Sequence, residues 1–261
     1  MPQTIAAPSW VMAGSIYENC VFLEQKVDEV GLLFFETDAC LAYTKDDLPP
    51  ALASLDLSYH VHMPLDLPWQ APEHVVDIVL ALMEKVQFLN VTKAVIHPPI
   101  TQGAAGIQPH AAQSAVRHLL QAWLNAGYAP NTLLLENIEG VDLTEYIQLV
   151  TEFACGLCID TGHMIAYGQD DLLVHPAIWD FLQMVHLNAP ADITTRKGRS
   201  KHASLTALDE RGRTLVRNVL ARCKPDTVLM YELFSWEHIL SSRTVVDALF
   251  LPENNQNTEP R

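Results

Sequence analysis

The chain has 261 residues, of which 49% are hydrophobic and 18% are charged, and its formal net charge is −15 at pH 7. This composition supplies apolar material for a large buried core and excludes a disordered chain, except at the ends. The acidic balance argues against a nucleic-acid-binding protein, because such proteins gain most of their affinity from basic residues that neutralise phosphates.

Short apolar runs alternate with longer amphipathic segments along the chain, which is the pattern of repeated βα units. We expect strands at residues 9–13, 29–36, 57–63, 93–97, 132–137, 155–160, 183–187 and 227–233. We expect helices at residues 16–27, 48–55, 72–88, 108–125, 143–153, 205–222 and 236–249, and a short one after Gly162. Ser15 is a candidate N-cap for the first helix. Eight such units in one chain of this length predict an α/β fold, a single (β/α)8 TIM barrel.

The rest of the chain adds no second domain. We expect a TIM-barrel catalytic domain over residues 1–251 and a disordered polar tail over residues 252–261. No apolar run approaches the roughly 18 residues of a membrane span, and the N-terminus lacks a signal-peptide pattern.

The five cysteines are irregularly spaced, which indicates reduced thiols and predicts a cytoplasmic protein with no membrane partner. Cys155 and Cys158 resemble a CxxC pair, but on a strand they face opposite sides and are interpreted as packing residues.

Charged or imidazole side chains stand at or near the ends of the expected strands, where burial is costly unless the group is paired or binds a metal. These residues are Glu36, His60, His62, His97, Glu136, Asp160, His163, His186 and Glu232. The carboxyl ends of barrel strands converge on one face, so we expect these side chains to meet there. Imidazole and carboxylate are ligands of zinc, manganese and iron, and the candidates outnumber the ligands of one tetrahedral ion. The sequence therefore predicts two divalent ions bridged by carboxylates.

Several of these residues also have simpler interpretations. Glu136 follows three leucines and could be an interior carboxylate paired with a basic residue, although few basic residues lie near strand ends. Asp160 could cap a helix that leaves His163 exposed, but their spacing also lets both aim at one point. His60 and His62 share one strand face, and His62, nearer the strand end, is the expected ligand. His60 is then expected to support a ligand or contact the substrate.

The segment after the seventh expected strand departs from the acidic average. It holds four basic residues beside a histidine, namely Arg196, Lys197, Arg199, Lys201 and His202. A basic run is usually solvated surface, but this one is expected at the barrel mouth, where it predicts phosphate binding. Trp69 and Trp236 follow strand ends and are candidates for an apolar substrate surface, with ordinary rim packing as the alternative.

Four motifs resemble the endonuclease IV and xylose isomerase-like barrel superfamily. They are Leu135-Glu136-Asn137, Cys158-Ile159-Asp160-Thr161-Gly162-His163, Val185-His186-Leu187-Asn188 and Tyr231-Glu232. The resemblance implies a metal cluster, and its implied ligands are His97, Glu136, Asp160, His163, His186, His202, Glu232 and, less directly, His62. The endonucleases carry Asp-x-His after the seventh strand, whereas Ser200 stands here at the Asp position. This departure favours a two-metal site over a three-metal site.

The N-terminal third resembles a subgroup of that superfamily, the cobamide-remodelling phosphodiesterases. The matching residues are Glu18-Asn19, Lys26-Val27-Asp28-Glu29-Val30, Leu33-Phe34-Phe35-Glu36 and Tyr59-His60-Val61-His62-Met63-Pro64-Leu65-Asp66-Leu67. The resemblance implies hydrolysis of the phosphoribosyl bond in the nucleotide loop of vitamin B12-type corrinoids, which serves corrinoid salvage. Glu136 and Glu232 would then be the central catalytic carboxylates, and Glu36 a base or substrate contact.

Three other functions stay open. A sugar or sugar-phosphate isomerase or epimerase would use two carboxylates around a metal, and the basic segment argues weakly against a neutral sugar. An abasic-site DNA endonuclease is disfavoured by the net charge of −15 and by Ser200. A catalytically inactive metal-binding protein would take up metal without turnover. The sequence leaves the oligomeric state open.

Overall fold

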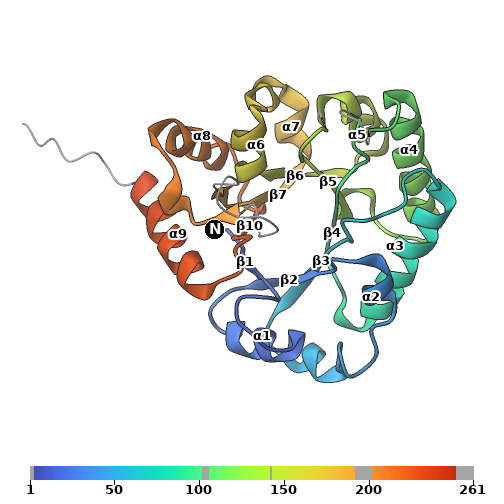
Figure 1. The fold of residues 1–261 in the computed structure, drawn as a ribbon, viewed down its shortest axis with the longest axis horizontal. Coiled ribbons are helices and arrows are strands. Elements are labelled where there is room, and N and C mark those ends of the chain that lie inside the picture. Colours follow the sequence, from blue (N-terminus) through green and yellow to red (C-terminus); the bar gives the residue numbers. More distant parts are fainter. Residues whose placement is uncertain (1–2, 102–105, 142, 192–201, 251–261) are drawn as a thin grey trace, which may run out of the picture.

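A computed structural model describes residues 3–101, 106–141, 143–191 and 202–250. Parallel strands close into a barrel in the order β1-β10-β7-β6-β5-β4-β3-β2, and helices surround it (Figure 1). The predicted TIM barrel is therefore confirmed. A small antiparallel hairpin, β8 (Ala189–Pro190) and β9 (His202–Ala203), lies outside the barrel sheet. No helix within the described residues is both long and apolar enough to cross a membrane.

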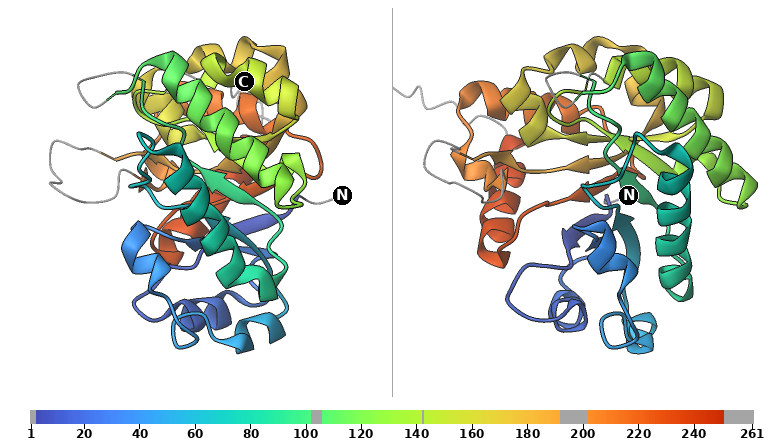
Figure 2. Two further views of the ribbon diagram at one scale, coloured as in Figure 1. Left: turned by 90° about the vertical axis from the view of Figure 1, so that its right-hand side faces the viewer. Right: turned by 45° about the vertical axis from the view of Figure 1, so that its right-hand side comes forward.

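The elements follow the expected alternation of strand and helix, as the side views in Figure 2 show. The barrel strands are β1 (Ile5–Pro8), β2 (Glu29–Leu33), β3 (Ser58–His62), β4 (Ala94–Ile96), β5 (Leu133–Glu136), β6 (Gly156–Asp160), β7 (Leu182–His186) and β10 (Val228–Met230). The α-helices are α1 (Ile16–Leu23), α2 (Thr37–Leu41), α3 (Pro72–Val86), α4 (Pro109–Asn125), α5 (Ile147–Phe153), α6 (Thr161–Tyr167), α7 (Pro176–Phe181), α8 (Glu210–Leu220) and α9 (Trp236–Leu249). Short 3-10 helices are η1 (Pro50–Ser54), η2 (Gln87–Leu89), η3 (Pro130–Thr132), η4 (Leu143–Tyr146), η5 (Asp170–Val174) and η6 (Leu205–Ala207).

The first strand differs from the prediction. The expected strand at residues 9–13 was placed too late, because β1 is Ile5–Pro8 and residues 10–14 form the β1–α1 loop. The helix expected over 205–222 is divided into the 3-10 helix η6 and helix α8. Asp209 is the N-cap of α8, and its side chain accepts a hydrogen bond from the Gly212 amide at 2.8 Å. The short helices α2 and α7 were not predicted, because five or six residues are too few to show a helical period.

The barrel divides the apolar side chains into two clusters. A large one fills the space between strands and helices, and a smaller one lies inside the barrel. The inner cluster is Ala6, Val95, Leu134, Cys158, Met184, Val228 and Met230. Burial on both faces explains why the strands read as near-continuous apolar runs. Cys155 belongs to the outer cluster and Cys158 to the inner one, and both are free thiols, so their interpretation as packing residues is confirmed.

The β1–α1 loop is held by a buried asparagine. The Asn19 side-chain oxygen accepts hydrogen bonds from the Val11 amide (2.8 Å) and the Met12 amide (3.0 Å). Its Nδ2 donates to the Met12 and Ser15 carbonyls at 3.2 and 3.0 Å. Ser15 and Glu18 form a capping box at the start of α1, which confirms the predicted N-cap. The loop is thus fixed to the helix that follows it.

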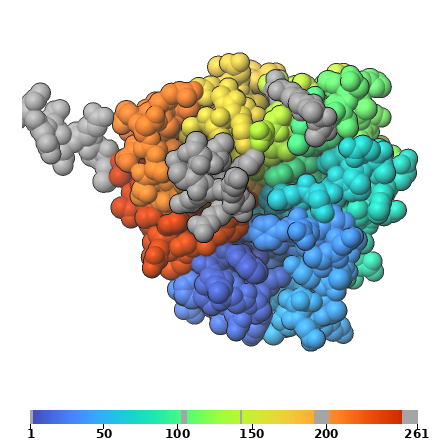
Figure 3. All heavy atoms as spheres, viewed as in Figure 1, coloured from blue at the N-terminus to red at the C-terminus, as the bar shows by residue number. Residues whose placement is uncertain are grey.

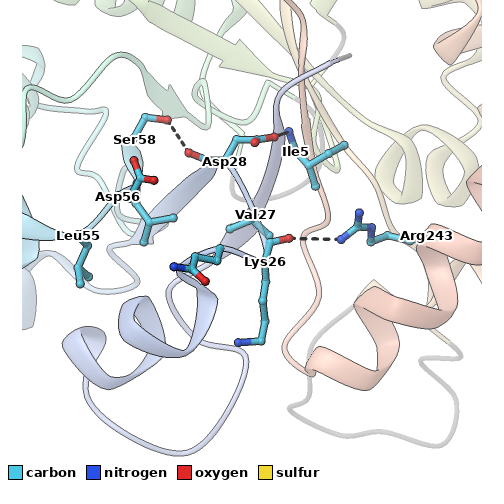
Figure 4. A pocket seen from close by; sticks show the side chains of 10 residues that line it. Ile5, Lys26, Val27, Asp28, Leu55, Asp56, Ser58 and Arg243 are labelled. Carbon is cyan, nitrogen blue, oxygen red and sulfur yellow. Dashed lines mark hydrogen bonds between the residues drawn. The ribbon is translucent and has the colours of Figure 1, made fainter.

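The N-terminal side of the barrel carries a pocket of about 520 Å³ between the starts of β1, β2 and β3 and helix α9 (Figure 4). Its polar groups bond to one another. Asp28 Oδ2 accepts from the Ile5 amide at 2.8 Å, and Ser58 Oγ donates to the Asp28 carbonyl at 2.9 Å. Arg243 Nη1 donates to the Lys26 carbonyl at 3.4 Å. These bonds join loops on the face of a TIM barrel that usually serves stability, and we assign no catalytic role to it.

The Asn19 contacts lead to a stability prediction. We expect Asn19→Ala to lower the free energy of unfolding by about 2–4 kcal/mol, because a buried and a partly buried backbone amide lose their acceptor. Urea denaturation measures this change. As a control, Asn125→Ala, at the exposed end of α4, should change it by less than about 0.5 kcal/mol. Equal effects in the two variants would contradict the structural role of Asn19.

Candidate metal centre

Imidazole side chains from several strands surround one buried carboxylate. Glu136, the last residue of β5, is 0% exposed. Its Oε2 lies 3.2 Å from His62 Nε2, 3.5 Å from His97 Nε2 and 3.4 Å from His186 Nδ1. These residues stand at or just beyond the carboxyl ends of β3, β4 and β7. The predicted convergence of strand ends therefore brings them within ligand distance of one another.

A second carboxylate extends this cluster across the barrel. Glu232, just after β10, has its Oε2 3.2 Å from His186 Nδ1 and 3.3 Å from His202 Nδ1. His202 comes from the β8–β9 hairpin. Asp160 pairs in register with His186 on neighbouring parallel strands, so both side chains point to the barrel interior. His163 Nδ1 lies 3.5 Å from Glu136 Oε1, which joins it to the same cluster.

Main-chain carbonyls orient three of the imidazole rings. In each ring Nδ1 lies at hydrogen-bonding distance from a carbonyl oxygen. The pairs are His62 with Met63 (2.9 Å), His163 with Asn137 (3.0 Å) and His202 with Glu232 (3.1 Å). A carbonyl can only accept, so these contacts place a proton on Nδ1 and make Nε2 the ring atom that could bind a metal. Metal-binding histidines are commonly oriented in this way.

Asp160 is held from three directions. Its Oδ1 accepts from the His163 amide at 2.6 Å, and its Oδ2 accepts from Asn188 Nδ2 at 2.5 Å. Its own amide donates to Asn137 Oδ1 at 2.7 Å. Gly162 makes room for this arrangement, because a Cβ there would lie 1.8 Å from Asn188 Oδ1. Neither Asn188 nor Gly162 was predicted as a site residue, although both stand in the motifs that carry the superfamily resemblance.

The alternative interpretation, in which Asp160 caps a helix and His163 is exposed, is correct for Asp160 but not for His163. Asp160 is the N-cap of α6, yet His163 is only 9% exposed and is not the solvated side chain that this alternative expects. One carboxylate therefore both caps the helix and faces the cluster.

The donor set fits divalent metal ions. Three overlapping groups have ligand atoms within 4.8 Å of one another: His62, Glu136 and His186; Asp160, His163 and His202; and Glu136, Asp160, His186 and Glu232. Glu136 Oε1, Glu232 Oε2 and both ring nitrogens of His186 are buried without a hydrogen-bond partner among the described residues. Within the same residues, neither carboxylate pairs with a lysine or arginine. Buried carboxylates without a cation are unfavourable, and an ion at these shared positions would remove that cost.

The pKa values of the site residues indicate which groups carry the charge that balances the buried carboxylates when no metal ion is bound. Burial alone would raise the pKa of Glu136, but the imidazoles of His186 and His97 outweigh it and hold the pKa well below its usual value. Burial lowers the pKa of His163, but the carboxylates of Asp160 and Glu136 outweigh it and raise the pKa to about 10. The pKa of His186 is also raised, against burial, by Cys158, Glu136 and Glu232. In the metal-free protein, protons on His163 and His186 therefore balance the carboxylates.

The cluster forms the floor of a pocket of about 410 Å³. The side chains that line it are Leu33, Phe34, Phe35, His62, Leu65, His97, Ile100, Glu136, Ile138, Glu139, His163, Tyr167, His202, Glu232 and Phe234. In Figure 3 the successive segments of the chain follow one another around the molecule, from dark blue through green and yellow to red. The pocket thus combines a polar floor with largely apolar walls.

Four predicted site residues lie elsewhere. His60 is fully buried inside the barrel, where its Nδ1 lies 2.6 Å from Glu29 Oε1, and it does not line the pocket. Glu36 is exposed at the start of α2 and is also absent from the lining. Trp69 packs in the core, and Trp236 packs edge-on against Phe22 at 5.7 Å between ring centroids.

The positions of these four residues have a common cause. Period two and proximity to a strand end do not reveal how far along the barrel axis a side chain lies, or toward which neighbour it turns. The basic residues Arg196, Lys197, Arg199 and Lys201, together with Ser200, lie outside the described residues.

The comparison with known protein families matches residues 39–216 to the xylose isomerase-like TIM barrels. The chain belongs to this family. Endonuclease IV from Thermus thermophilus is similar in structure, with a TM-score of 0.65, 20% identity, and coverage of 94% of this chain and 99% of its own. A D-tagatose 3-epimerase-like protein has a TM-score of 0.69, 13% identity, and coverage of 94% and 96%. The IOLI protein, solved with a bound zinc atom, has a TM-score of 0.68, 14% identity, and coverage of 94% and 97%.

These low identities show a shared fold. A search of the curated proteins found no match. The motif resemblance to the superfamily is confirmed by the family match, and the similar solved structures include proteins named as a nuclease and as an epimerase. For this xylose isomerase-like barrel, the substrate has to be argued from the pocket itself.

The cluster predicts which change abolishes metal binding. We expect Glu136→Gln to lose most of the bound metal, because Glu136 belongs to two of the three ligand groups. Element analysis of purified protein by mass spectrometry measures the content of zinc, manganese and iron. His118→Ala, at an exposed position on α4, serves as the control and should keep the wild-type content. Unchanged metal in Glu136→Gln would contradict the proposed ligand set.

The raised imidazole pKa values predict proton release on metal binding. His163, with its pKa raised to about 10, is protonated at pH 7 in the metal-free protein, and a metal can bind only the neutral ring. Apparent metal affinity should therefore increase as the pH rises from 7 toward 10. Calorimetric titrations in buffers of different ionisation enthalpy count the protons released at pH 7. Binding that releases no proton would show that the imidazoles are already neutral.

Proposed function

We propose that this protein is a metal-dependent phosphodiesterase that hydrolyses the phosphoribosyl bond in the nucleotide loop of cobamides. The observation that carries the proposal is one pocket with ligands for more than one ion on its floor and apolar side chains on its walls. A cobamide has the matching parts, since its phosphodiester joins the ribose oxygen of a riboside to an arm that carries the large corrin ring. The resemblance of the N-terminal third to cobamide-remodelling phosphodiesterases points the same way.

The residues that would hold the ions are the eight that converge at the strand ends: His62, His97, Glu136, Asp160, His163, His186, His202 and Glu232. Divalent ions bound there would supply Lewis acidity toward the phosphoryl oxygens and toward an attacking water. A zinc atom in the similar IOLI structure is consistent with this donor set.

The protein's own groups prepare the site for this reaction. The carbonyls of Met63, Asn137 and Glu232 fix three imidazole rings before substrate arrives, so little reorganisation is needed. Asn188 holds Asp160 in one orientation. A substrate bound against the apolar walls would displace water from them, which would strengthen electrostatic interactions in the pocket.

The chemistry balances as a simple hydrolysis. A water oxygen attacks phosphorus, the bond between phosphorus and the ribose oxygen breaks, and that oxygen takes up a proton. The products are a cobinamide phosphate and an α-riboside. Arg196, Lys197, Arg199 and Lys201 remain proposed contacts to the phosphate from the segment outside the described residues. We do not propose Glu36 as a base, because its exposed side chain does not line the pocket.

A sugar isomerase or epimerase is the second candidate, since epimerases share the fold. The pocket walls argue against it, because sugar hydroxyls placed against Phe35, Leu65 and Ile100 would lose water without gaining hydrogen bonds. A DNA endonuclease has support from the fold alone, and the charge of −15 opposes binding along a strand of phosphates.

The direct test is incubation of metal-quantified protein with coenzyme B12, with products separated by chromatography. We expect cobinamide phosphate to appear, and we expect Glu136→Gln and chelator-treated protein to lose at least about a hundredfold in rate. The His118→Ala variant should match the wild type. Intact corrinoid after exposure to fully metal-loaded protein would exclude the cobamide assignment and favour other phosphoesters or sugar phosphates.

A further inference from the structure

Large apolar side chains are exposed together around the mouth of the metal-centre pocket. Phe35, Leu65 and Ile100 are 41%, 56% and 40% exposed, and all three line this pocket. They come from three successive segments, which follow β2, β3 and β4. Phe234, after β10, completes the group, which we call the apolar collar. Grouped apolar exposure of this kind is unfavourable in water and commonly marks a binding surface.

Hydrogen bonds hold the collar in place. The Leu65 amide donates to the Phe35 carbonyl at 3.2 Å, which ties the loops after β3 and β2 together. Asp66 Oδ1 then accepts from both the amide and the hydroxyl of Thr37, each at 2.8 Å. These bonds fix the two loops that carry Phe35 and Leu65, and both side chains line the pocket.

The collar is continuous with the metal centre. The Phe234 ring stacks on His202, with centroids 6.0 Å apart and planes 12° apart. On its other side Phe234 contacts Phe35, with centroids 6.1 Å apart. A molecule whose phosphate lies over Glu136 and Glu232 would therefore meet this aromatic surface with whatever group is attached to the phosphate.

We propose that the collar binds a broad apolar ring system attached to the phosphate, and that this contact selects the substrate. The inference rests on the proposed function, because it takes the metal centre as the place where the phosphate binds. Opposite the collar residues, Tyr167 donates a hydrogen bond to Glu139 at 3.2 Å, which gives the pocket a polar side for the other half of a phosphodiester. The apolar collar would thus contact the ring system on one side of the phosphate, and the polar side with Tyr167 and Glu139 would contact the group on the other.

Binding of two phosphomonoesters to the metal-loaded protein tests the collar without turnover. Pyrenylmethyl phosphate carries a flat apolar ring system and is fluorescent, whereas methyl phosphate carries almost no apolar surface. Fluorescence titration gives the Kd of the first, and displacement gives the Kd of the second. We expect the wild type to bind pyrenylmethyl phosphate at least roughly tenfold more tightly, since burying an aromatic ring system removes much apolar area from water.

Serine substitutions identify the residues responsible. Phe35→Ser and Leu65→Ser should each weaken binding of pyrenylmethyl phosphate by roughly three- to tenfold and leave methyl phosphate within about twofold. Leu240→Ser is the matched control, because Leu240 is 47% exposed on α9 and lies outside the pocket lining. Metal content and thermal unfolding verify that each variant keeps its fold and its metal centre.

The outcomes separate the two proposals. Equal affinity of the wild type for both phosphates, or no effect of Phe35→Ser and Leu65→Ser, would overturn the collar. If the collar variants weaken pyrenylmethyl phosphate while the wild type leaves coenzyme B12 intact, the cobamide assignment falls and the collar stands. If the wild type cleaves coenzyme B12, the same two variants should raise KM by roughly three- to tenfold with little change in kcat.

Discussion

The burial of Glu136 is the constraint on which the rest of the site depends. A carboxylate removed from water at the end of an apolar strand is tolerated only beside compensating charge. The barrel supplies that charge from other strands, because the ends of parallel strands converge on one face. Protonated imidazoles provide it in the metal-free protein, and divalent ions would provide it more strongly. The positions of His62, His97, His163 and His186 around this one carboxylate follow from that requirement.

The interior of the barrel changes character along its axis. Apolar side chains such as Val95, Leu134 and Met184 form the inner cluster, while the metal-centre residues stand at the carboxyl ends of the strands. A buried pair, Glu29 and His60, interrupts the apolar part and satisfies one ring nitrogen of His60. The apolar filling gives the polar ends a rigid support, which is what metal ligands need in order to hold fixed positions.

The mouth of the barrel adds apolar side chains to a site whose floor is polar. A metal centre alone would suit many phosphoesters or sugars, since this fold family includes both kinds of enzyme. The collar narrows the choice, because Phe35, Leu65 and Ile100 favour an apolar partner and penalise desolvated hydroxyls or phosphates. The polar floor and the apolar walls together support the proposed substrate, a phosphodiester with two unequal arms.

The sequence by itself determined the barrel and predicted most of the residues that gather in the candidate metal centre. Eight apolar runs that alternate with helices in a chain of this length favour burial as the strands of a closed barrel, and a charged residue that ends such a run needs compensation. Glu136, Asp160, Glu232 and His97 were therefore recognisable from local pattern, and the resemblance added His202 as a ligand. The family match supports the barrel and the superfamily to which those motifs pointed.

Only the tertiary structure decided what depends on contacts between distant segments. His60 turns to Glu29 and away from the pocket, although it has the same strand periodicity as His62. The contact between Asn188 and Asp160, which requires Gly162, joins β6 to the segment after β7. The collar likewise gathers side chains from four separate loops. No local sequence pattern reveals these contacts between distant residues, because they depend on how the strands pair and how the loops hydrogen-bond to one another in the closed barrel.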